Sequence, residues 1–469
     1  MTDGLRRALL MVLITWFAFA GYILGRFAND AFPTYYLLRP LIVAIPLAVV
    51  IGVVAQWRFP SYAPLAAAIA VGLLTFWGTV ARHWQEVALA GGALLIVILV
   101  ARWRGWPLAA VLRAASTAAT AFIVVFFLSG VARAVLSAEG AIAPVEAAAS
   151  ASGPNIYLVM LDAYPRRDTL LNDMGIDNGP FEEALAARGF DVHDDATTDR
   201  RYTDLTLMCL LTGSTEGVPL DTDFGHDYQW ELRRLLSEAP LPRQARQAGY
   251  EYYVIDSPAG HVTFSAGTHI QHGGINTLED HMLTQSLLGP AVAWLMPSLP
   301  TDTLRAHFEA SVASLTSLVD PDAHRLVLAH LFQPHLPFLW DAAGNPLPAP
   351  SYWPGVKLDA GQLEVMGMTL DEYSASMEAD LATLNRKLLV MLDEIVARDP
   401  GAVIVLFSDH GSRYSLALKE SEWHRSFLAA RTPGHETLFA SDPKPTAILR
   451  TLLPIYVLRE RTGQPSLGP

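Results

Sequence analysis

Residues 155–162 read Asn-Ile-Tyr-Leu-Val-Met-Leu-Asp, and residues 403–411 read Val-Ile-Val-Leu-Phe-Ser-Asp-His-Gly. Each stretch is a short apolar run that ends in a charged or ligating side chain. Such runs are typical of strands in a parallel sheet that is covered on both faces. Ligands gather beyond the carboxyl ends of these strands, so we expect Asp162, Asp409 and His410 at one edge of one sheet.

The rest of the second half alternates between strand and helix patterns. Further buried strands are predicted at 250–255 and 325–332, and the strand before Asp409 at 402–407, with helices near 178–188, 228–248, 302–319 and 371–398. This alternation predicts an α/β fold with a mostly parallel sheet that has helices on both faces. On the last helix, Glu372, Glu378 and Asp380 are interpreted as a solvated face.

The first 140 residues are chemically different from the remainder. They hold ten arginines against four acidic residues, a charge of +6, which leaves −19 for the other 329 residues of a chain whose net charge is −13. Five apolar stretches approach the roughly 20 helical residues that span a membrane. We place them near 8–25, 37–56, 61–81, 87–103 and 114–136. The predicted domains are therefore a five-helix transmembrane bundle (1–136), a small-residue linker (137–153) and an extracytoplasmic domain (154–469).

Arginine placement predicts which side of the membrane the second half occupies. Arg102, Arg104 and Arg113 cluster before the last span, and positive residues favour the inner side. We therefore expect the N-terminus inside and the chain from residue 137 outside, in a multi-pass protein of a bacterial inner membrane. Whether the spans only anchor the protein or also hold a lipid substrate stays open. The acidic second half argues against nucleic acid as a partner.

Two segments carry candidate chemistry. Two carboxylates and an imidazole at one sheet edge suit one divalent ion, Zn²⁺ or Mn²⁺, with Mg²⁺ as a third candidate. Either aspartate taken alone would fit a helix N-cap better than a metal ligand, and only the two together with His410 favour the metal. The segment Arg-Tyr-Thr-Asp-Leu-Thr at 201–206 offers Thr203, whose hydroxyl becomes a good nucleophile when a metal lowers its pKa. The segment alone also fits Thr203 as the N-cap of a helix at 204–211.

These segments resemble the alkaline phosphatase superfamily, and in particular its membrane-anchored sulfatase-like branch, which includes lipoteichoic acid synthases and phosphoethanolamine transferases. The resemblance implies that Asp162, Thr203, Asp409 and His410 bind the metal. It also implies that Thr203 carries the transferred group as a covalent intermediate. In sulfatases a Thr-Gly pair follows the reactive cysteine by nine residues, and counting back from Thr212-Gly213 reaches Thr203, not Thr206.

The sequence departs from true sulfatases at that position. Thr203 cannot be oxidised to formylglycine, and Leu205 and Leu207 replace the proline and arginine of the sulfatase signature. The usual route of sulfate ester hydrolysis is therefore disfavoured. Cys209 is the only cysteine, which excludes an internal disulfide and a thiolate cluster, and it is expected to be a packed helix residue.

Other residues are candidates for substrate contact. Related proteins resemble the Pro-His-Leu-Pro-Phe segment at 334–338, which implies substrate contact, or protonation of the leaving oxygen, for His335. Arg201, Arg413 and His424 could neutralise a phosphoryl group, although each also fits a solvated loop. His330 is expected within a strand. Four histidines, at 261, 269, 272 and 281, are expected in a loop that covers the site.

The sequence thus favours a metal-dependent transferase or hydrolase of phosphodiesters that moves a phospholipid-derived head group through a threonine intermediate. Its expected partners are membrane lipids and a lipid-borne or envelope glycan substrate, and no oligomeric state is predicted. Two alternatives remain. One is a sulfate or phosphate ester hydrolase acting on glycans or small molecules, and the other is a non-catalytic membrane protein that keeps the fold.

Overall fold

The backbone divides into two compact units. One consists of Met1–Ala141 and Asn276–Met296, and the other of Ile142–Ile275 and Pro297–Pro469. Residues 276–296, from the second half of the sequence, thus belong with the N-terminal helices. The computed structural model describes residues 3–29, 34–75, 100, 103–105, 107–138, 152–221, 235–258, 267–270, 272, 275, 278–279, 282–283, 286–347, 361–434 and 437–458.

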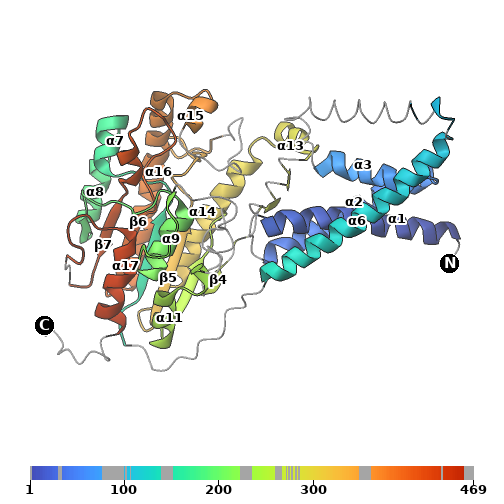
Figure 1. The fold of residues 1–469 in the computed structure, drawn as a ribbon. Helices are drawn as coiled ribbons and strands as arrows, with labels where there is room; N and C mark the ends of the chain where they lie inside the picture. Colours follow the sequence, from blue (N-terminus) through green and yellow to red (C-terminus); the bar gives the residue numbers. More distant parts are fainter. Residues whose placement is uncertain are drawn as a thin grey trace. The chain divides into compact units, whose positions relative to one another are not determined.

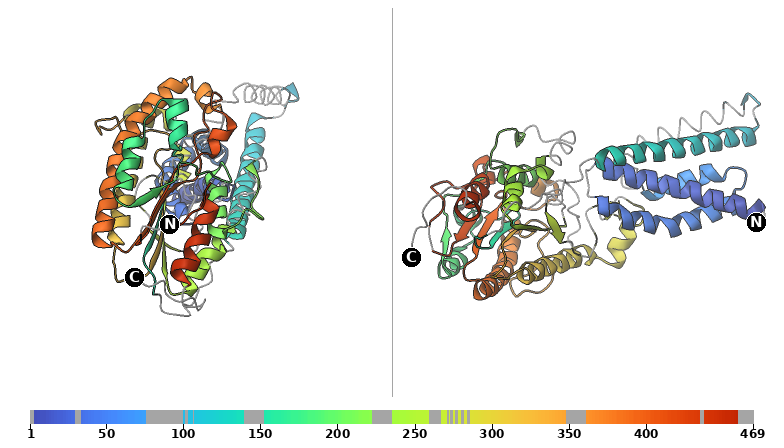
Figure 2. Two further views of the ribbon diagram at one scale, coloured as in Figure 1. Left: turned by 90° about the vertical axis from the view of Figure 1, so that its left-hand side faces the viewer. Right: turned by 90° about the horizontal axis from the view of Figure 1, so that it is seen from below.

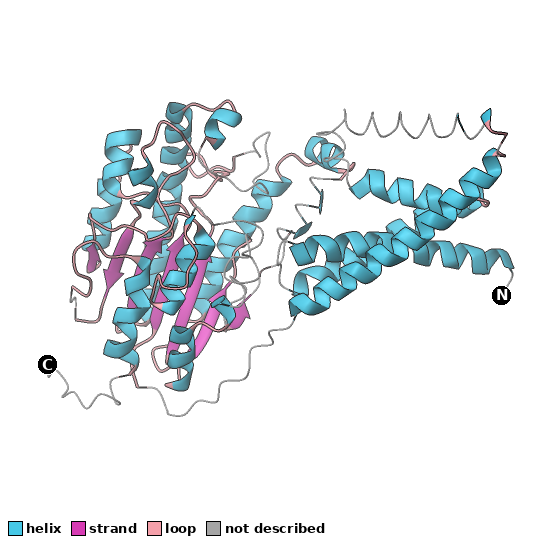
Figure 3. Cartoon of the chain, viewed as in Figure 1, coloured by secondary structure: helices cyan, strands magenta, loops and turns pink. Residues whose placement is uncertain are grey.

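The described part of the first unit is helical (Figures 1 and 3). Its helices are α1 (Asp3–Asn29), η1 (Thr34–Leu37), α2 (Leu38–Arg58), α3 (Ala63–Thr75), α6 (Leu108–Ala138) and α13 (Gly289–Leu295). Three of them, α1, α2 and α6, are long and apolar enough to cross a membrane. The third predicted span is described only as the shorter helix α3, and the fourth, 87–103, lies almost entirely outside the described residues. Five spans therefore remain a prediction.

Close packing and exposed apolar side chains both fit a membrane environment for these helices. Gly52 of α2 lies against the backbone of Val12 in α1, where a methyl group would clash. Small residues at such contacts allow membrane helices to approach closely. On the outer face of α2, Ile42, Val43 and Val50 are more than half exposed. A helix with this much exposed apolar surface is better solvated by lipid than by water.

The second unit is built on a seven-stranded sheet. Its strands lie in the order β2-β7-β6-β1-β5-β3-β4, with β1, β3, β4, β5 and β6 parallel and with β7 antiparallel to both β6 and β2. A mostly parallel α/β sheet is thus confirmed. The strands are β1 (Ile156–Leu161), β2 (Phe190–Val192), β3 (Glu251–Ile255), β4 (Thr268–Ile270), β5 (Arg325–Leu331), β6 (Val403–Ser408) and β7 (Leu428–Arg431).

Helices cover both faces of this sheet (Figure 2). On one face Tyr157, Val159 and Leu161 of β1 pack with side chains of α7, α8, α14 and α16. On the other face the alternate residues Ile156, Leu158 and Met160 pack with α9, α11 and α17. The helices are α7 (Arg167–Met174), α8 (Gly179–Ala186), α9 (Thr203–Thr212), α11 (Pro240–Gln247), α14 (Leu299–Ser317), α15 (Gln362–Val365), α16 (Leu370–Arg398), η4 (Glu420–His424), α17 (Pro445–Leu452) and the turn η5 (Leu453–Val457).

One residue of α16 does not lie where the sequence placed it. Asp380 is completely buried, so its assignment to a solvated helix face is wrong. Its Oδ1 atom accepts hydrogen bonds from the backbone N–H groups of Leu339 and Trp340, at 2.7 and 2.9 Å. Asp380 therefore fixes the backbone of the segment that follows His335. Glu372 closes the first turn of α16 in a capping box with Thr369.

Candidate metal centre

Three predicted ligands meet at the carboxyl edge of the two central strands. Leu161 of β1 is in register with Ser408 of β6, so the residues that follow them emerge side by side. Ligand atoms of Asp162, Asp409 and His410 all lie within 4.8 Å of one another, and the three side chains are buried. Neither aspartate caps a helix, because the helix after Asp162 begins at Arg167 and the helix after Asp409 begins at Glu420. The structure thus brings together the groups that the sequence placed at this edge.

A tight turn after Asp162 holds the edge in place. Ala163 has a φ of 61°, a left-handed conformation that is uncommon for a residue with a side chain. The backbone N–H of Ala163 donates to Asp409 Oδ1 at 3.0 Å, and that of Tyr164 donates to Ser408 Oγ at 2.8 Å. Backbone strain of this kind is concentrated at functional sites. The turn therefore links the β1 end directly to the Asp-His pair.

The donor set fits a divalent cation. His410 Nδ1 lies 2.7 Å from the carbonyl oxygen of Gly411, which can only accept, so the proton is on Nδ1 and the lone pair is on Nε2. That Nε2 atom lies 3.6 Å from Asp162 Oδ1 and 3.4 Å from Asp409 Oδ2. Within the described part of the chain, Asp409 Oδ2 is buried and accepts no hydrogen bond. Two buried carboxylates this close need a positive charge between them.

Sequence reasoning missed the part that His330 plays. It lies in β5, as expected, but its Nε2 atom is 3.0 Å from Asp162 Oδ2, and both side chains are buried. Groups that hydrogen-bond to metal-ligating carboxylates orient them and tune their affinity. The available signal was a histidine within the otherwise apolar run 326–331.

Thr203 is the first residue of α9, and Tyr202 occupies the N-cap position. Thr203 is 5% exposed. One turn later, Thr206 donates from its hydroxyl to the carbonyl oxygen of Asp409 at 2.9 Å, and Arg413 donates to the carbonyl oxygen of Arg201. These two bonds tie the start of α9 to the Asp-His segment. Thr206 is thereby committed to a structural bond, while Thr203 lies at the helix N-terminus, where free N–H groups favour an anion.

Two arginines that were predicted to contact the substrate stack on Tyr202, the residue before Thr203. The guanidinium carbon of Arg201 lies 5.1 Å from the ring centre of Tyr202 and 5.2 Å from that of Trp423. Arg413 lies 5.1 Å from the same Tyr202 ring and 5.6 Å from Tyr414. Stacking holds a guanidinium in place without using its N–H donors. Within the described residues Arg201 Nε is buried and donates no hydrogen bond, so a donor remains available for an anionic ligand.

His335 faces the same group of side chains. Its ring centre lies 5.5 Å from that of Tyr414, which in turn lies 6.5 Å from His410. Loss of contact with water, together with the nearby charge of Arg413, lowers the pKa of His335 to about 3, although the hydrogen bond to the Leu336 carbonyl opposes the shift. The ring is therefore neutral at pH 7. Because its Nδ1 atom is 2.7 Å from the Leu336 carbonyl oxygen, the Nε2 atom holds the lone pair.

The other described candidate histidines have partners outside the group of three ligands. His424 bonds through Nδ1 to the carbonyl oxygen of Thr198 at 3.0 Å, at the end of η4. His269 of β4 pairs with Asp256, the residue after β3, with 2.9 Å between Nδ1 and Oδ1. His272 lies edge-on to His307, with 5.1 Å between the ring centres, while His261 and His281 lie outside the described residues. Among the described residues only Asp162, Asp409 and His410 form a metal-ligand group.

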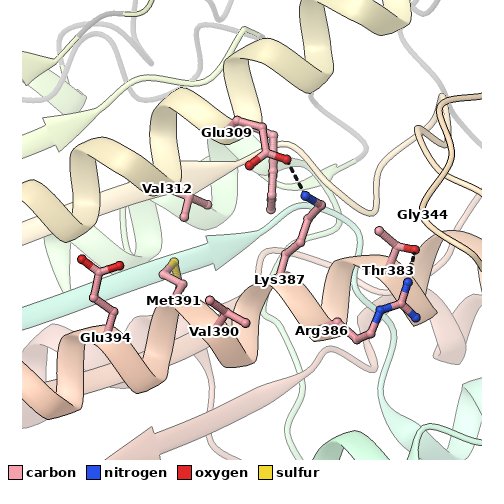
Figure 4. A pocket seen from close by; sticks show the side chains of 10 residues that line it. Glu309, Val312, Gly344, Thr383, Arg386, Lys387, Val390, Met391 and Glu394 are labelled. Carbon is pink, nitrogen blue, oxygen red and sulfur yellow. Dashed lines mark hydrogen bonds and ion pairs between the residues drawn. The ribbon is translucent and has the colours of Figure 1, made fainter.

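A separate pocket lies between α14 and α16 (Figure 4). Its volume is about 450 Å³, and it is crossed by an ion pair of 2.6 Å between Lys387 and Glu309. None of its lining residues is a metal ligand or a predicted substrate contact. The candidate chemistry therefore lies at the sheet edge and not in this pocket.

Comparison with solved structures finds matches of low sequence identity. The C-terminal periplasmic domain of EcEptC from Escherichia coli matches with 17% identity and a TM-score of 0.42 over 67% of this chain and 86% of that chain. The same domain in complex with Zn matches with 17% identity and a TM-score of 0.43 over 67% and 87%. The 2-O GAG sulfatase BT1596 matches with 12% identity and a TM-score of 0.42 over 65% and 70%.

No family model and no curated protein matches this chain. These neighbours are a periplasmic domain and a sulfatase, both with TM-scores below 0.5. The resemblance to the sulfatase-like branch of the alkaline phosphatase superfamily therefore rests on the segments around Asp162, Thr203 and Asp409-His410. The activity has to follow from the residues of the chain itself.

Proposed function

We propose that this protein is a membrane-anchored, metal-dependent enzyme that cleaves a phosphodiester of a lipid head group, with Thr203 as its nucleophile. The observation that carries the proposal is the meeting of Asp162, Asp409 and His410 at one buried sheet edge, within 4.8 Å. The ties from Thr206 and Arg413 that bring the start of α9 to the same segment support it. We assign the metal to Asp162, Thr203, Asp409 and His410.

The chemistry follows from these side chains. A divalent ion held there would lower the pKa of the threonine hydroxyl and neutralise charge on the phosphoryl oxygens. Thr203 Oγ1 attacks phosphorus, the bond from phosphorus to the lipid alcohol breaks, and the alcohol leaves with the hydroxyl proton. The head group is then an ester of Thr203. A second alcohol, or water, attacks the same phosphorus, breaks the threonine ester and restores the hydroxyl.

The residues around Thr203 suit the two halves of this reaction. The stacked Arg201 and Arg413 can bind the phosphoryl oxygens as negative charge develops. His335, neutral and with its lone pair on Nε2, can contact the substrate or accept the proton of the incoming alcohol. It is less suited to the protonation of the leaving oxygen that the family resemblance also allowed, because its pKa is about 3. His424 remains a candidate contact at the rim.

Membrane anchoring supports a lipid-borne substrate. A site tethered to the bilayer meets head groups at a high effective concentration. We assign the site to the outer side of a bacterial inner membrane, because the arginine-rich segment before α6 favours the inner side. The accepting molecule would then be a second lipid or an envelope glycan, and water would make the enzyme a hydrolase.

The test is a mass measurement on the intact protein. Purified protein is incubated with bacterial lipid vesicles, quenched with acid and weighed, and the metal content is measured in parallel. We expect a head-group phosphate to be added at Thr203 in the unmodified protein and to be absent in Thr203→Ala. A reduced but measurable amount is expected in Thr203→Ser, which keeps a hydroxyl. The Thr212→Val variant serves as the control, because the Thr212 hydroxyl at the far end of α9 donates within the helix to the carbonyl oxygen of Met208. Full phosphodiester turnover by a metal-loaded Thr203→Ala protein would refute the mechanism.

A further inference from the structure

The segment Ser-Leu-Leu-Gly-Pro-Ala-Val-Ala-Trp-Leu-Met at 286–296 carries no charged side chain. It contains α13, which is far too short to span a bilayer. Yet Trp294, Leu295 and Met296 are 81%, 67% and 51% exposed, and Leu287 and Leu288 are both 44% exposed. An uncharged run with several large exposed apolar side chains needs a partner other than water.

This segment is bonded to the helices of the first unit. The backbone N–H of Leu287 donates to the carbonyl oxygen of Leu74 near the end of α3, at 2.9 Å. Just upstream, Glu279 forms an ion pair of 2.6 Å with Arg39 of α2. Met282 packs against the apolar core of α1, α2 and α3. The 286–296 segment is therefore held by the membrane unit, although the sequence between the strands of the second unit encodes it.

The contacts place the segment at one particular end of those helices. Arg39 lies at the start of α2, and Leu74 lies at the end of α3. With the N-terminus inside, both positions lie at the outer surface of the membrane, because α2 runs inward and α3 runs outward. Tyr36, just before the start of α2, and Leu278 are both buried in one small apolar cluster and form a second contact at this end of the helices.

We propose that residues 286–296 form an interfacial anchor that binds the lipid surface of the outer leaflet. Trp294 fits the head-group level, where amphipathic rings gather, and Leu288, Leu295 and Met296 enter the boundary of the acyl chains. The choice of lipid rests on continuity, because the anchor extends the apolar surface of helices that already need lipid around them. The anchor proposal rests on the membrane location given under the proposed function. It adds a lipid-contact site outside the membrane-spanning helices.

Depth-dependent quenching tests this proposal directly. An environment-sensitive fluorophore is attached at Leu295→Cys in protein reconstituted into phospholipid nanodiscs with or without lipids that carry a nitroxide near the head group. The control is Val390→Cys on α16, which has a matching exposure of 68%. The native Cys209 should stay unlabelled, because it is 1% exposed and burial raises its thiol pKa to about 11.

We expect blue-shifted emission at position 295 and quenching by the nitroxide lipid at least threefold stronger than at position 390. Emission typical of water, or equal quenching at both positions, would overturn the anchor. Blue-shifted emission without lipid quenching would also overturn it, because it would mean that a protein surface or a second copy of the chain covers the segment.

Turnover gives a second measurement. The pair Trp294→Asp and Leu295→Asp should lower kcat/KM on vesicle lipid about tenfold and leave kcat/KM on a water-soluble phosphodiester unchanged, and Val390→Asp should change neither. An equal loss on both substrates would contradict the anchor. If the unmodified protein turned over neither substrate, the proposed function would fail, while the quenching result would still decide the anchor.

Discussion

The contact between His330 and Asp162 can be tested directly by its effect on metal binding. Their side chains lie 3.0 Å apart between Nε2 and Oδ2 in a buried setting, so His330 fixes the orientation of a metal-binding carboxylate. Removing a partner of this kind typically weakens metal binding by about 10- to 100-fold. We expect His330→Ala to raise the Kd for Zn²⁺ by that factor. A chelator competition titration measures it.

The same titration includes two further variants. His330→Gln keeps a side-chain N–H donor and should recover part of the affinity. His324→Ala is the control, because His324 lies just before the other end of β5 and bonds to the carbonyl oxygen of Gly153. If His330→Ala bound Zn²⁺ as tightly as the unmodified protein, Asp162 would not depend on His330 for its orientation.

Some residues of the site could be found from sequence and others could not. Asp162, Asp409 and His410 were accessible because a ligating side chain directly after a buried strand is unusual. Trp423 was not, because its stacking with Arg201 joins segments more than 200 residues apart, a contact that no sequence periodicity indicates.

At the scale of the element, α16 contains a carboxyl group that should make stability depend on pH. Burial raises the pKa of Asp380 to about 7, although two backbone N–H groups partly oppose the shift. The folded protein therefore keeps this proton up to about pH 7, while an unfolded chain releases it near pH 4. The free energy of unfolding should fall as the pH rises through that window, by an amount on the order of a few kcal/mol.

Asp380→Asn tests this dependence. It keeps an oxygen acceptor for Leu339 and Trp340 but cannot ionise, so the stability it gains over the unmodified protein should grow between pH 4 and pH 7. Thermal unfolding in detergent at several pH values measures the difference. Asp380→Ala removes the acceptor as well and should be less stable than Asp380→Asn at every pH. A constant difference between the Asn variant and the unmodified protein would show that Asp380 stays ionised in the folded protein.

The elements themselves were predictable in proportion to their length and burial. The 156–161 strand is observed with the predicted bounds, and the strands at 250–255, 325–332 and 402–407 are displaced by one residue or less at each end. The three-residue edge strands β2 and β4 and the four-residue strand β7 were missed, because short strands lack a long apolar run. The helix predicted from 302 begins three residues earlier, at Leu299. Such boundaries are set by packing as much as by local preference.

At the scale of the whole molecule, composition separated the two halves but could not assign residues 276–296. Their apolar run is short and lies within the second half of the sequence. A division into consecutive domains therefore assigns it to the extracytoplasmic domain at 154–469. Its bonds to Arg39 and Leu74 are made by the folded chain and leave no trace in composition. The N-terminal unit is therefore encoded by two separate stretches of the sequence, 1–141 and 276–296.

The sidedness of the chain is the last prediction, and the single buried cysteine makes it straightforward to measure. Cys209 is inaccessible, so a new exposed cysteine should be the only site that a maleimide labels. We choose Gly4→Cys, which has open space around it in α1, and Leu171→Cys, which is 46% exposed in α7. A membrane-impermeant maleimide applied to spheroplasts should label position 171 at once. Because α1 begins on the inner side, position 4 should react only after permeabilisation. The reverse order would place Asp162, Thr203 and their neighbours inside the cell, away from outer-leaflet lipid and envelope glycans, and would remove the assigned substrate class.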